Sequence, residues 1–330
     1  MIARLGVAFL FFLIVVGAAA GGAYLWFARA VLVPGPSQAE QTLVIAPGSG
    51  LGAIARQLET AGIVADARLF ELQARRAGHA RALKSGEYKF EPGISLVAAL
   101  DKIVRRDVVA RFFTVPEGLV TSDILAIVAE TPGLVGEAPG PLEDGELLPE
   151  TYRYEWGDTR AAVIGRMRAA QEAALAELWA TRDADLPISS PQEAVILASI
   201  VEKETGVASE RPRVASVFIN RLRRGMKLQS DPTVIYGLSP KTGQLDRSIT
   251  RADLQAPTAY NTYVVTGLPP SPICHPGRAA LAAVLKPIPS NEIYFVADGT
   301  GGHAFAPTLT EHNKNVARWR KIEREIKANP

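Results

Sequence analysis

A single carboxylate at the end of a buried helix is the residue in this chain best placed to do chemistry. The segment Ser190–Gly206 begins with a good N-cap and a proline at the first helical position, and it ends at a glycine. Residues 194–201 are apolar on every face except at Ser199, which is typical of a buried helix. Glu202 follows at the edge of this run. Desolvation and the negative end of the helix dipole both disfavour the charged carboxylate there.

A carboxylic acid that stays protonated near neutral pH can act as a general acid on a glycosidic oxygen. We therefore predict that Glu202 is a catalytic acid. The spacing alone is equally consistent with a solvated helix end, in which Lys203 is the counter-charge. Glu204 lies about 200° further round the helix than Glu202. We expect it to face away and to pair with a basic side chain.

Two long loops rich in polar and aromatic residues follow this helix, at 227–238 and 256–270. Long loops in a compact domain are often functional. Amide, hydroxyl and carboxylate groups there offer hydrogen bonds to sugar hydroxyl and acetamido groups, and tyrosine rings offer flat faces. Each residue alone is also consistent with a core or turn role. Together they predict a saccharide-binding cleft with the members Gln229, Ser230, Asp231, Tyr236, Tyr260, Asn261 and Tyr263.

Other reaction classes have little support in the sequence. The chain has no G-x-S-x-G motif, so it lacks the nucleophile turn of a serine hydrolase. Its four histidines show no ligand spacing, and we expect no metal site and no cofactor. The single cysteine, Cys274, lies beside His275 in a turn, but neighbours in sequence are not thereby a catalytic pair. The remaining histidines are His79, His303 and His312.

The N-terminal segment predicts a membrane anchor. Leu5–Phe27 carries no charge and is long enough to cross a bilayer as a helix. A cleaved signal peptide is the alternative, because Ala18–Ala20 resembles a cleavage site, but apolar residues continue to Phe27. We predict an uncleaved single-pass anchor in the inner membrane, with residues 1–4 cytoplasmic and the rest of the protein on the periplasmic side. The formal net charge of +2 gives no electrostatic case for nucleic acid binding.

The remaining chain predicts an α+β protein with two folded parts. Residues 28–41 contain Pro34, Gly35 and Pro36 and read as a linker. Residues 42–115 alternate short strand and helix patterns and form a small α+β module. Residues 116–330 form a larger mixed α+β domain, which contains the candidate acid.

The small module carries a weak resemblance of its own. Residues 44–58 read V-I-A-P-G-x-G-L-x-x-I-A-x-x-L and resemble a LysM-like unit, a fold associated with N-acetylglucosamine glycans. The alternative is a purely structural spacer.

Seven separated motifs in the larger domain carry a more specific resemblance. They occur in order as A-S-I-V-E-K-E-T, V-F-I-N-R-L, L-Q-S-D-P-T-V-I-Y-G, A-Y-N-T-Y, G-L-P-P, Y-F-V-A-D-G and G-G-H-A-F. Together with the apolar N-terminus they resemble the MltG (YceG-like) family of membrane-anchored endolytic murein transglycosylases. Two positions depart from the family pattern, with Ser271 in place of a common glycine and His275 in place of a common asparagine.

The resemblance implies cleavage of the β-1,4 bond between N-acetylmuramic acid and N-acetylglucosamine in nascent peptidoglycan strands, leaving a 1,6-anhydro end. It implies that Glu202, the first glutamate of E-K-E, is the catalytic residue, and that peptidoglycan synthases are partners. Glu150, Gln229, Asp231, Tyr260 and Asn261 are implied as cleft residues, and Tyr152 is expected beside Glu150.

Two other functions stay open at this point. The first is a glycan hydrolase that uses water, with Asp231 or Glu150 as the second carboxylate. The second is a non-catalytic scaffold that holds peptidoglycan through the LysM-like module.

Overall fold

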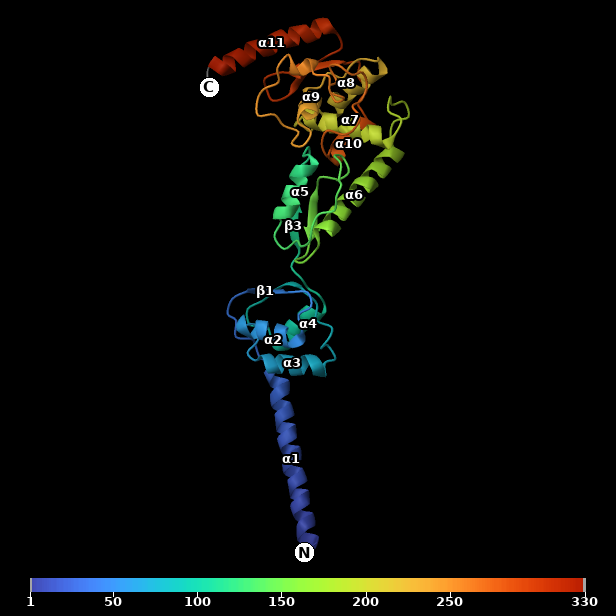
Figure 1. Cartoon of the computed structure of the whole chain (residues 1–330). Helices are drawn as coiled ribbons and strands as arrows, with labels where there is room; N and C mark the ends of the chain where they lie inside the picture. The colour runs from blue at the N-terminus through green and yellow to red at the C-terminus, as the bar shows by residue number, and fades with distance from the viewer. Residues whose placement is uncertain (1, 329–330) are drawn as a thin grey trace. The chain divides into compact units, whose positions relative to one another are not determined.

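The computed structural model describes residues 2–328, which divide into two compact units (Figure 1). The first unit contains the chain up to Arg111 together with residues 132–134 and 153–158. The second contains residues 112–131, 135–152 and the chain from Thr159 onward. The chain thus leaves the first unit close to the predicted boundary after residue 115. It then returns to that unit twice, in segments that the sequence assigned to the larger domain.

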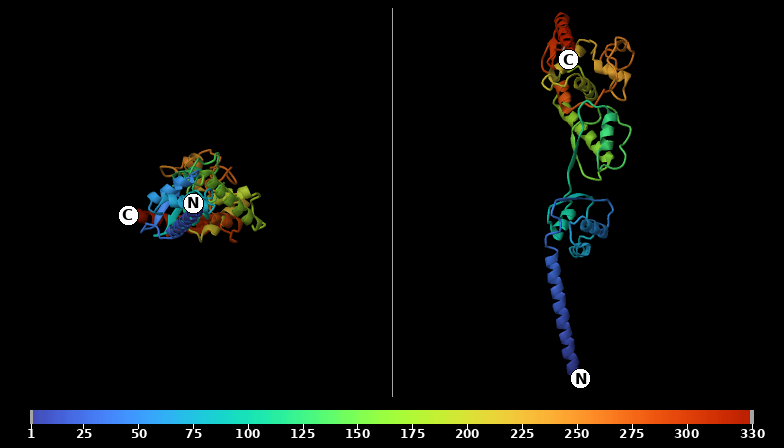
Figure 2. Two further views of the ribbon diagram at one scale, coloured as in Figure 1. Left: turned by 90° about the horizontal axis from the view of Figure 1, so that it is seen from below. Right: turned by 90° about the vertical axis from the view of Figure 1, so that its left-hand side faces the viewer.

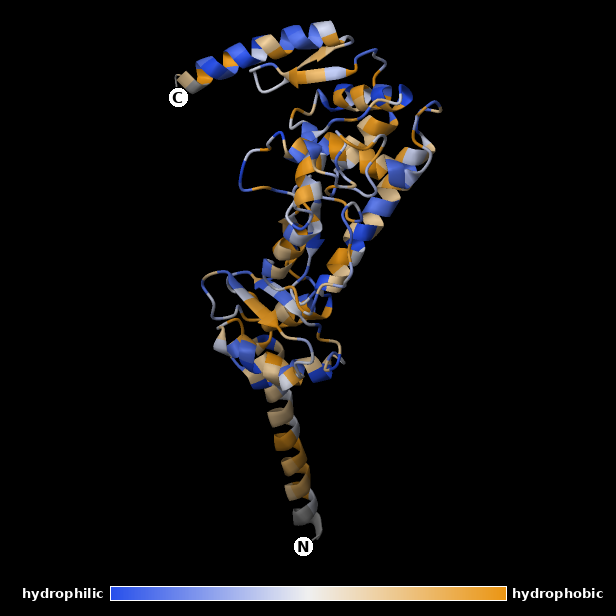
Figure 3. Cartoon of the chain, turned by 45° about the horizontal axis from the view of Figure 1, so that its top comes forward, coloured by the Kyte–Doolittle hydropathy of each residue, from blue (hydrophilic) through white to orange (hydrophobic). Residues whose placement is uncertain are grey.

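Helix α1 (Ile2–Ala30) contains the predicted anchor and extends beyond it. Its segment Gly6–Ala30 is long and apolar enough to cross a membrane, and the helix carries mostly apolar colours in Figure 3. Most of its large side chains are exposed. Of the predicted cytoplasmic residues 1–4, Met1 lies outside the described residues. Exposed apolar side chains along a helix of this length are what a lipid environment accommodates.

A two-stranded antiparallel sheet and three helices form the small module. Strands β1 (Gln41–Ile45) and β2 (Gly86–Phe90) pair so that Leu43 lies opposite Tyr88. Asp66 and Ser95 cap helices α3 and α4 with their side chains, as their residue types predict. The apolar stripes of the helices close over the sheet, and the core includes the fully buried Phe70. The three helices are α2 (Leu51–Thr60), α3 (Ala67–Arg76) and α4 (Leu96–Val104).

The segment expected to be a linker packs against this module. Phe27 and Val31, at the end of α1 and just after it, are buried in the module core. The N–H of Gly35 donates to the carbonyl of Ile94 at 3.1 Å. A Cβ at Gly35 would lie 2.3 Å from the carbonyl oxygen of Ile63, so only glycine allows this close approach. Residues 31–35 therefore hold the end of α1 to the module instead of forming a free spacer.

The second unit combines mainly helices with short strands (Figures 1 and 2). Helix α7 packs against α6, α8, α9 and α10, and helix α11 packs against the hairpin of β5 and β6. The elements from Arg111 onward are β3 (Arg111–Thr114), α5 (Thr121–Glu130), β4 (Thr151–Tyr154), α6 (Arg160–Ala180), α7 (Pro191–Glu204), α8 (Arg211–Arg223), α9 (Asp231–Leu238), the 3₁₀ turn Asp253–Gln255, α10 (Arg278–Leu285), β5 (Tyr294–Ala297), β6 (His303–Ala306) and α11 (Leu309–Ala328). Of these, the first residue of β3 and the last two of β4 belong to the first unit.

Helix α7 is the centre of this unit. Every residue from Ala194 to Val201 is buried, as the all-apolar pattern predicts. The side chain of Ser190 accepts the backbone N–H of Glu193, and the side chain of Glu193 accepts the backbone N–H of Ser189. These two hydrogen bonds cap the start of the helix. The one polar residue inside the run, Ser199, donates to the carbonyl of Ile196. Because this helix is buried, the residues of its last turn have a fixed position in the unit.

Two local expectations are corrected by the structure. The sequence predicts a loop over 227–238, but Asp231–Leu238 is helix α9, because Pro232 in its first turn fits a helix start. A serine is a favourable N-cap, so Ser209 is expected to cap α8, but Glu210 is the N-cap residue and Ser209 is exposed. The carboxylate of Glu210 instead accepts the backbone N–H of His303, which ties the start of α8 to β6.

Candidate active site

Glu202 lies in the last turn of α7 with its side chain only 5% exposed. Its Oε2 accepts the backbone N–H of Gly277 at 2.9 Å, and its Oε1 accepts from Nη2 of Arg211 at 3.3 Å. Gly277 is the N-cap of α10, and Arg211 is the first residue of α8. The starts of two neighbouring helices therefore bind this carboxyl group.

Burial raises the pKa of Glu202 above the usual value of a glutamate. The hydrogen bond from Gly277 and the positive charge of Arg211 act to lower this pKa, while the negative charge of Glu117 raises it. The net effect favours the protonated acid, and its main cause is the desolvation that the apolar helix predicts. A glutamate with a raised pKa keeps its proton to a higher pH than an ordinary glutamate, as a general acid requires.

Glu117 is a second carboxylate at the same place. Its Oε2 lies 3.6 Å from Nη2 of Arg211, the same nitrogen that binds Glu202, and its side chain is 43% exposed. A Cβ at Gly277 would lie 1.7 Å from Oε1 of Glu117, so this carboxylate occupies the space beside the Gly277 backbone. Glu202, Glu117, Arg211 and Gly277 form one group of contacts, which we call the Glu202 cluster.

Glu204 has different partners from Glu202, as its position round the helix predicts. Ser230, instead of the expected basic side chain, donates its hydroxyl to Glu204 Oε1. Burial raises the pKa of Glu204 to about 7, and the charge of Asp231 adds to this effect. Helix α7 therefore carries two carboxyl groups with raised pKa values, each with its own set of neighbours.

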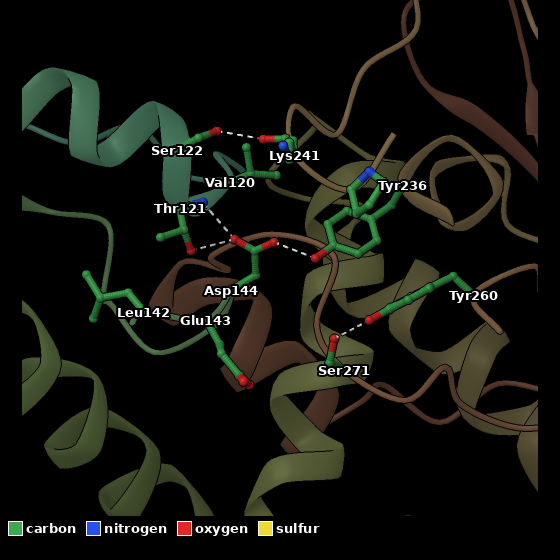
Figure 4. Close-up of a pocket in the computed structure, with 11 residues that line it drawn as sticks. Val120, Thr121, Ser122, Leu142, Glu143, Asp144, Tyr236, Lys241, Tyr260 and Ser271 are labelled. Atoms are coloured by element: carbon green, nitrogen blue, oxygen red, sulfur yellow. Dashed lines mark hydrogen bonds between the residues drawn. The ribbon is translucent and has the colours of Figure 1, made fainter. Parts of the chain in front are cut away.

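A cavity of about 550 Å³ is lined in part by residues that follow Glu117 and precede Gly277 in the chain (Figure 4). Two of the predicted tyrosines, Tyr236 and Tyr260, line it, with ring centroids 4.9 Å apart in an edge-on arrangement. The Tyr260 and Ser271 hydroxyls share a hydrogen bond of 2.7 Å. Glu202 is not part of the lining, but the two segments that contact it, 117–121 and 271–277, also supply residues of the cavity wall.

Asp144 organises one wall of this cavity. Its Oδ2 accepts from the Tyr236 hydroxyl at 2.7 Å, and its Oδ1 accepts from both the backbone and the hydroxyl of Thr121 (Figure 4). Behind it, His275 is fully buried and accepts the Leu147 N–H at Nδ1. Its Nε2 lies 3.0 Å from Thr121 Oγ1. Burial lowers the pKa of His275, which favours the neutral ring, and both of its ring nitrogens have hydrogen-bond partners in this part of the fold.

Three predicted cleft residues lie elsewhere. Asn261 is fully buried, and its side-chain amide donates to three carbonyl groups of residues 253–256. Tyr152 is buried against Phe113 and donates its hydroxyl to the Leu148 carbonyl. The side chain of Glu150 is exposed, and its carbonyl oxygen accepts the Val115 N–H. Asn261 and Tyr152 use their polar groups within the fold.

The other predicted residues gather near Glu204. The Tyr263 hydroxyl donates to Asp231 Oδ1 at 2.7 Å, and burial raises the pKa of this tyrosine. Ser230 is buried and bonds Glu204, while Gln229 is exposed with a positive φ of 53°. The structure thus separates the predicted set. Tyr236 and Tyr260 line the cavity, whereas Ser230, Asp231 and Tyr263 lie on the Glu204 side.

Sequence reasoning did not select Glu117, Arg211 or Asp144. Glu117 and Asp144 are distant in sequence from the groups that they contact, and Arg211, nine residues after Glu202, belongs to the next helix. For Glu117 one signal was present, since it lies between Pro116 and Gly118 at the predicted start of the larger domain. Within residues 2–328, no group of three or more His, Cys, Asp or Glu is arranged to hold a metal ion.

The chain resembles proteins of known family. A model described as the YceG-like family matches residues 43–318. The endolytic murein transglycosylase of Bacillus subtilis is 29% identical over 328 residues, which cover 89% of each chain. An endolytic murein transglycosylase of Streptococcus pneumoniae is 28% identical over 94% of this chain, which spans 64% of the length of that relative.

A solved structure shows the same fold. The crystal structure of a YceG-like protein from Listeria monocytogenes aligns with a TM-score of 0.52 and 28% identity, covering 84% of this chain and 99% of that chain. Because the family model covers most of the chain and both sequence and structural relatives agree with it, the protein belongs to the YceG-like family.

Proposed function

We propose that the protein is an endolytic murein transglycosylase in which Glu202 is the catalytic acid and then base. The observation that carries the proposal is the buried carboxyl of Glu202, with its raised pKa, in a chain whose relatives are endolytic murein transglycosylases. An enzyme of this class agrees with the prediction from the sequence motifs.

The proposed reaction needs only one acid-base group. Glu202 as carboxylic acid donates its proton to the glycosidic oxygen as the bond from that oxygen to C1 of N-acetylmuramic acid breaks. The resulting carboxylate then takes the proton of the muramic 6-hydroxyl as O6 bonds to C1 and closes a 1,6-anhydro ring. No water is consumed, and proximity within the substrate replaces a protein nucleophile.

The tyrosine-lined cavity supports the glycan-binding part of this proposal. Its wall combines two aromatic rings with hydroxyl groups of Thr121, Ser122 and Ser271, which suits a sugar ring and its polar substituents. We propose that Tyr236 and Tyr260 bind a saccharide unit of the strand there. Gln229, Asp231 and Tyr263 would contact a strand that passes the Glu204 side.

A hydrolase is the second candidate, and one observation favours it. Arg211 Nη2 lies 3.3 Å from Oε1 of Glu202 and 3.6 Å from Oε2 of Glu117. The two carboxylate oxygens therefore contact the same nitrogen atom. Retaining glycosidases use two carboxyl groups about 5–5.5 Å apart, and the shared contact with Arg211 allows such a spacing. Glu117 is therefore a better candidate for a second carboxylate than the predicted Asp231 or Glu150.

Product analysis distinguishes the candidates. The full-length chain in detergent is incubated with uncrosslinked glycan strands, and the new ends are identified by mass spectrometry. We expect 1,6-anhydro-muramic ends, which are lighter by one water than reducing ends. New reducing ends would show hydrolysis, and unchanged strands would favour a scaffold.

The location and partners follow as further parts of the proposal. Helix α1 is long and apolar enough for a single-pass anchor. We propose that it lies in the inner membrane with the folded units on the periplasmic side, that the LysM-like module contacts glycan, and that peptidoglycan synthases are partners.

A further inference from the structure

Glu117 is held at the Glu202 cluster by backbone contacts of its neighbours. The N–H of Gly118 donates to the His275 carbonyl at 2.9 Å, and the N–H of His275 donates to the Leu119 carbonyl at 2.8 Å. This exchange joins the segment after Glu117 to the segment before Gly277. Gly118 has a φ of +79°, which favours glycine, and a Cβ there would lie 3.7 Å from Glu202 Cγ. The backbone therefore brings residue 117 to Glu202.

Gly277 shows that the Glu117 side chain fills a defined space. A Cβ at Gly277 would lie 1.7 Å from Oε1 and 2.2 Å from Cδ of Glu117. The φ of Gly277 is −74°, a value that any residue adopts, so the backbone itself does not require glycine here. The absence of a side chain at this position makes room for the Glu117 carboxylate, directly beside the N–H that binds Glu202.

Arg211 is shared between the two carboxylates. Its side chain is 11% exposed, and Nη2 contacts both Glu202 and Glu117. Its Nε is buried and has no hydrogen-bond partner within residues 2–328. A guanidinium beside Glu202 alone would favour the ionised carboxylate. The carboxylate of Glu117 offsets that positive charge, and it does so while itself partly open to solvent.

We propose that Glu117 is a positioning residue of the reaction: it shares Arg211 with Glu202 and so keeps Glu202 in the protonated form that donates to the glycosidic oxygen. This inference rests on the proposed role of Glu202. It assigns Glu117 no bond to substrate.

The other charged groups near Glu202 do not replace this effect. Lys203, on the same helix, directs its ammonium to the Gly118 carbonyl at 3.3 Å. Cys274, on the segment before α10, is fully buried, and burial raises the pKa of its thiol so that it stays neutral. The charges that act on Glu202 are thus Glu117 from the segment before α5 and Arg211 from α8.

The test is the pH dependence of kcat/KM for Glu117→Gln. Since Glu202 must be protonated, activity falls as pH rises through its pKa. Removing the charge of Glu117 lowers that pKa, so we expect the alkaline limb to move down by about one pH unit and activity above it to fall about tenfold. Below the limb, where Glu202 is protonated in both proteins, activity should recover to within about threefold of the unmodified chain.

Three further variants make the test specific. Glu117→Asp keeps the charge, so its alkaline limb should stay close to that of the unmodified chain. Arg211→Gln removes the opposing charge and should move the limb upward, also in combination with Glu117→Gln. Glu177→Gln is the matched control, because it removes an exposed carboxylate that pairs with a different arginine, Arg278, and it should leave the limb in place.

The possible results separate this inference from the proposed function. If Glu117→Gln lowers activity equally at every pH, or leaves the limb unmoved, the inference is wrong while the role of Glu202 stands. If the unmodified chain yields no anhydro ends, the proposed function itself is wrong, whatever the Glu117 variants show. Thermal unfolding of each variant identifies any that do not fold, and Glu117→Asp then decides the question.

Discussion

At the scale of single residues, the environment of each carboxyl group decides what it can do. Glu202 and Glu204 are two positions apart on one helix, yet one binds Arg211 and the Gly277 backbone and the other binds Ser230. Burial raises both pKa values. The Glu202 site is distinguished by a direct ion pair with Arg211, whose side chain is largely buried and also contacts Glu117.

Asp144 is a second residue whose contacts give a clear expectation. It accepts three hydrogen bonds, from Tyr236 and from the backbone and hydroxyl of Thr121. Asp144→Asn replaces one accepting oxygen by a donor, which leaves a buried donor facing another donor. We expect a loss of about 1–3 kcal/mol in the free energy of unfolding, measured by calorimetry in detergent.

Glu143→Gln is the control for this prediction, because Glu143 is exposed in the same loop and should change stability by less than about 0.5 kcal/mol. Equal losses in both variants would show that the loop, and not the Asp144 network, determines the effect.

At the scale of elements, helix α7 joins the core to the segment that carries Gly277. Ser199, the only polar residue of the buried run, accepts the N–H of Ile273 at 3.0 Å. Ser199→Ala leaves that buried N–H without a partner, and we expect a loss of about 1–3 kcal/mol in the free energy of unfolding. Ser209→Ala should hardly change the free energy of unfolding, since Ser209 is exposed. Calorimetry of the two variants checks both expectations, and a larger loss for Ser209→Ala would contradict them.

Helix α7 and its cap follow directly from the sequence, because an all-apolar run with a capping serine admits few alternatives. The partners of Glu202 do not, because Glu117, Arg211 and Gly277 come from segments that only tertiary packing brings together. Asn261 shows the opposite difficulty. A polar residue in a loop suggests ligand binding, but its amide holds the carbonyl groups of its own loop. Residue type alone does not distinguish these two uses.

At the scale of the whole molecule, the end of α1 is part of the folded module. Phe27 is 8% exposed and packs in the core, whereas Leu25, two residues earlier, is 63% exposed. Phe27→Ala should lower the stability of the module by about 3–5 kcal/mol. Hydrogen exchange of the full-length chain in detergent should show less protection in β2 for Phe27→Ala and unchanged protection for Leu25→Ala. Equal protection in both variants would mean that the anchor and the module fold independently.

The rate at which full-length variants produce anhydro-ended glycan tests the central claim most directly. Glu202→Gln cannot donate the proton, so we predict at least a ~10²-fold lower rate with an unchanged unfolding temperature. Glu204→Gln can still accept from Ser230 and should stay within about tenfold of the unmodified chain. A Glu202→Gln protein that works at the normal rate, or a Glu204→Gln protein that folds but is inactive while Glu202→Gln retains activity, would contradict the account.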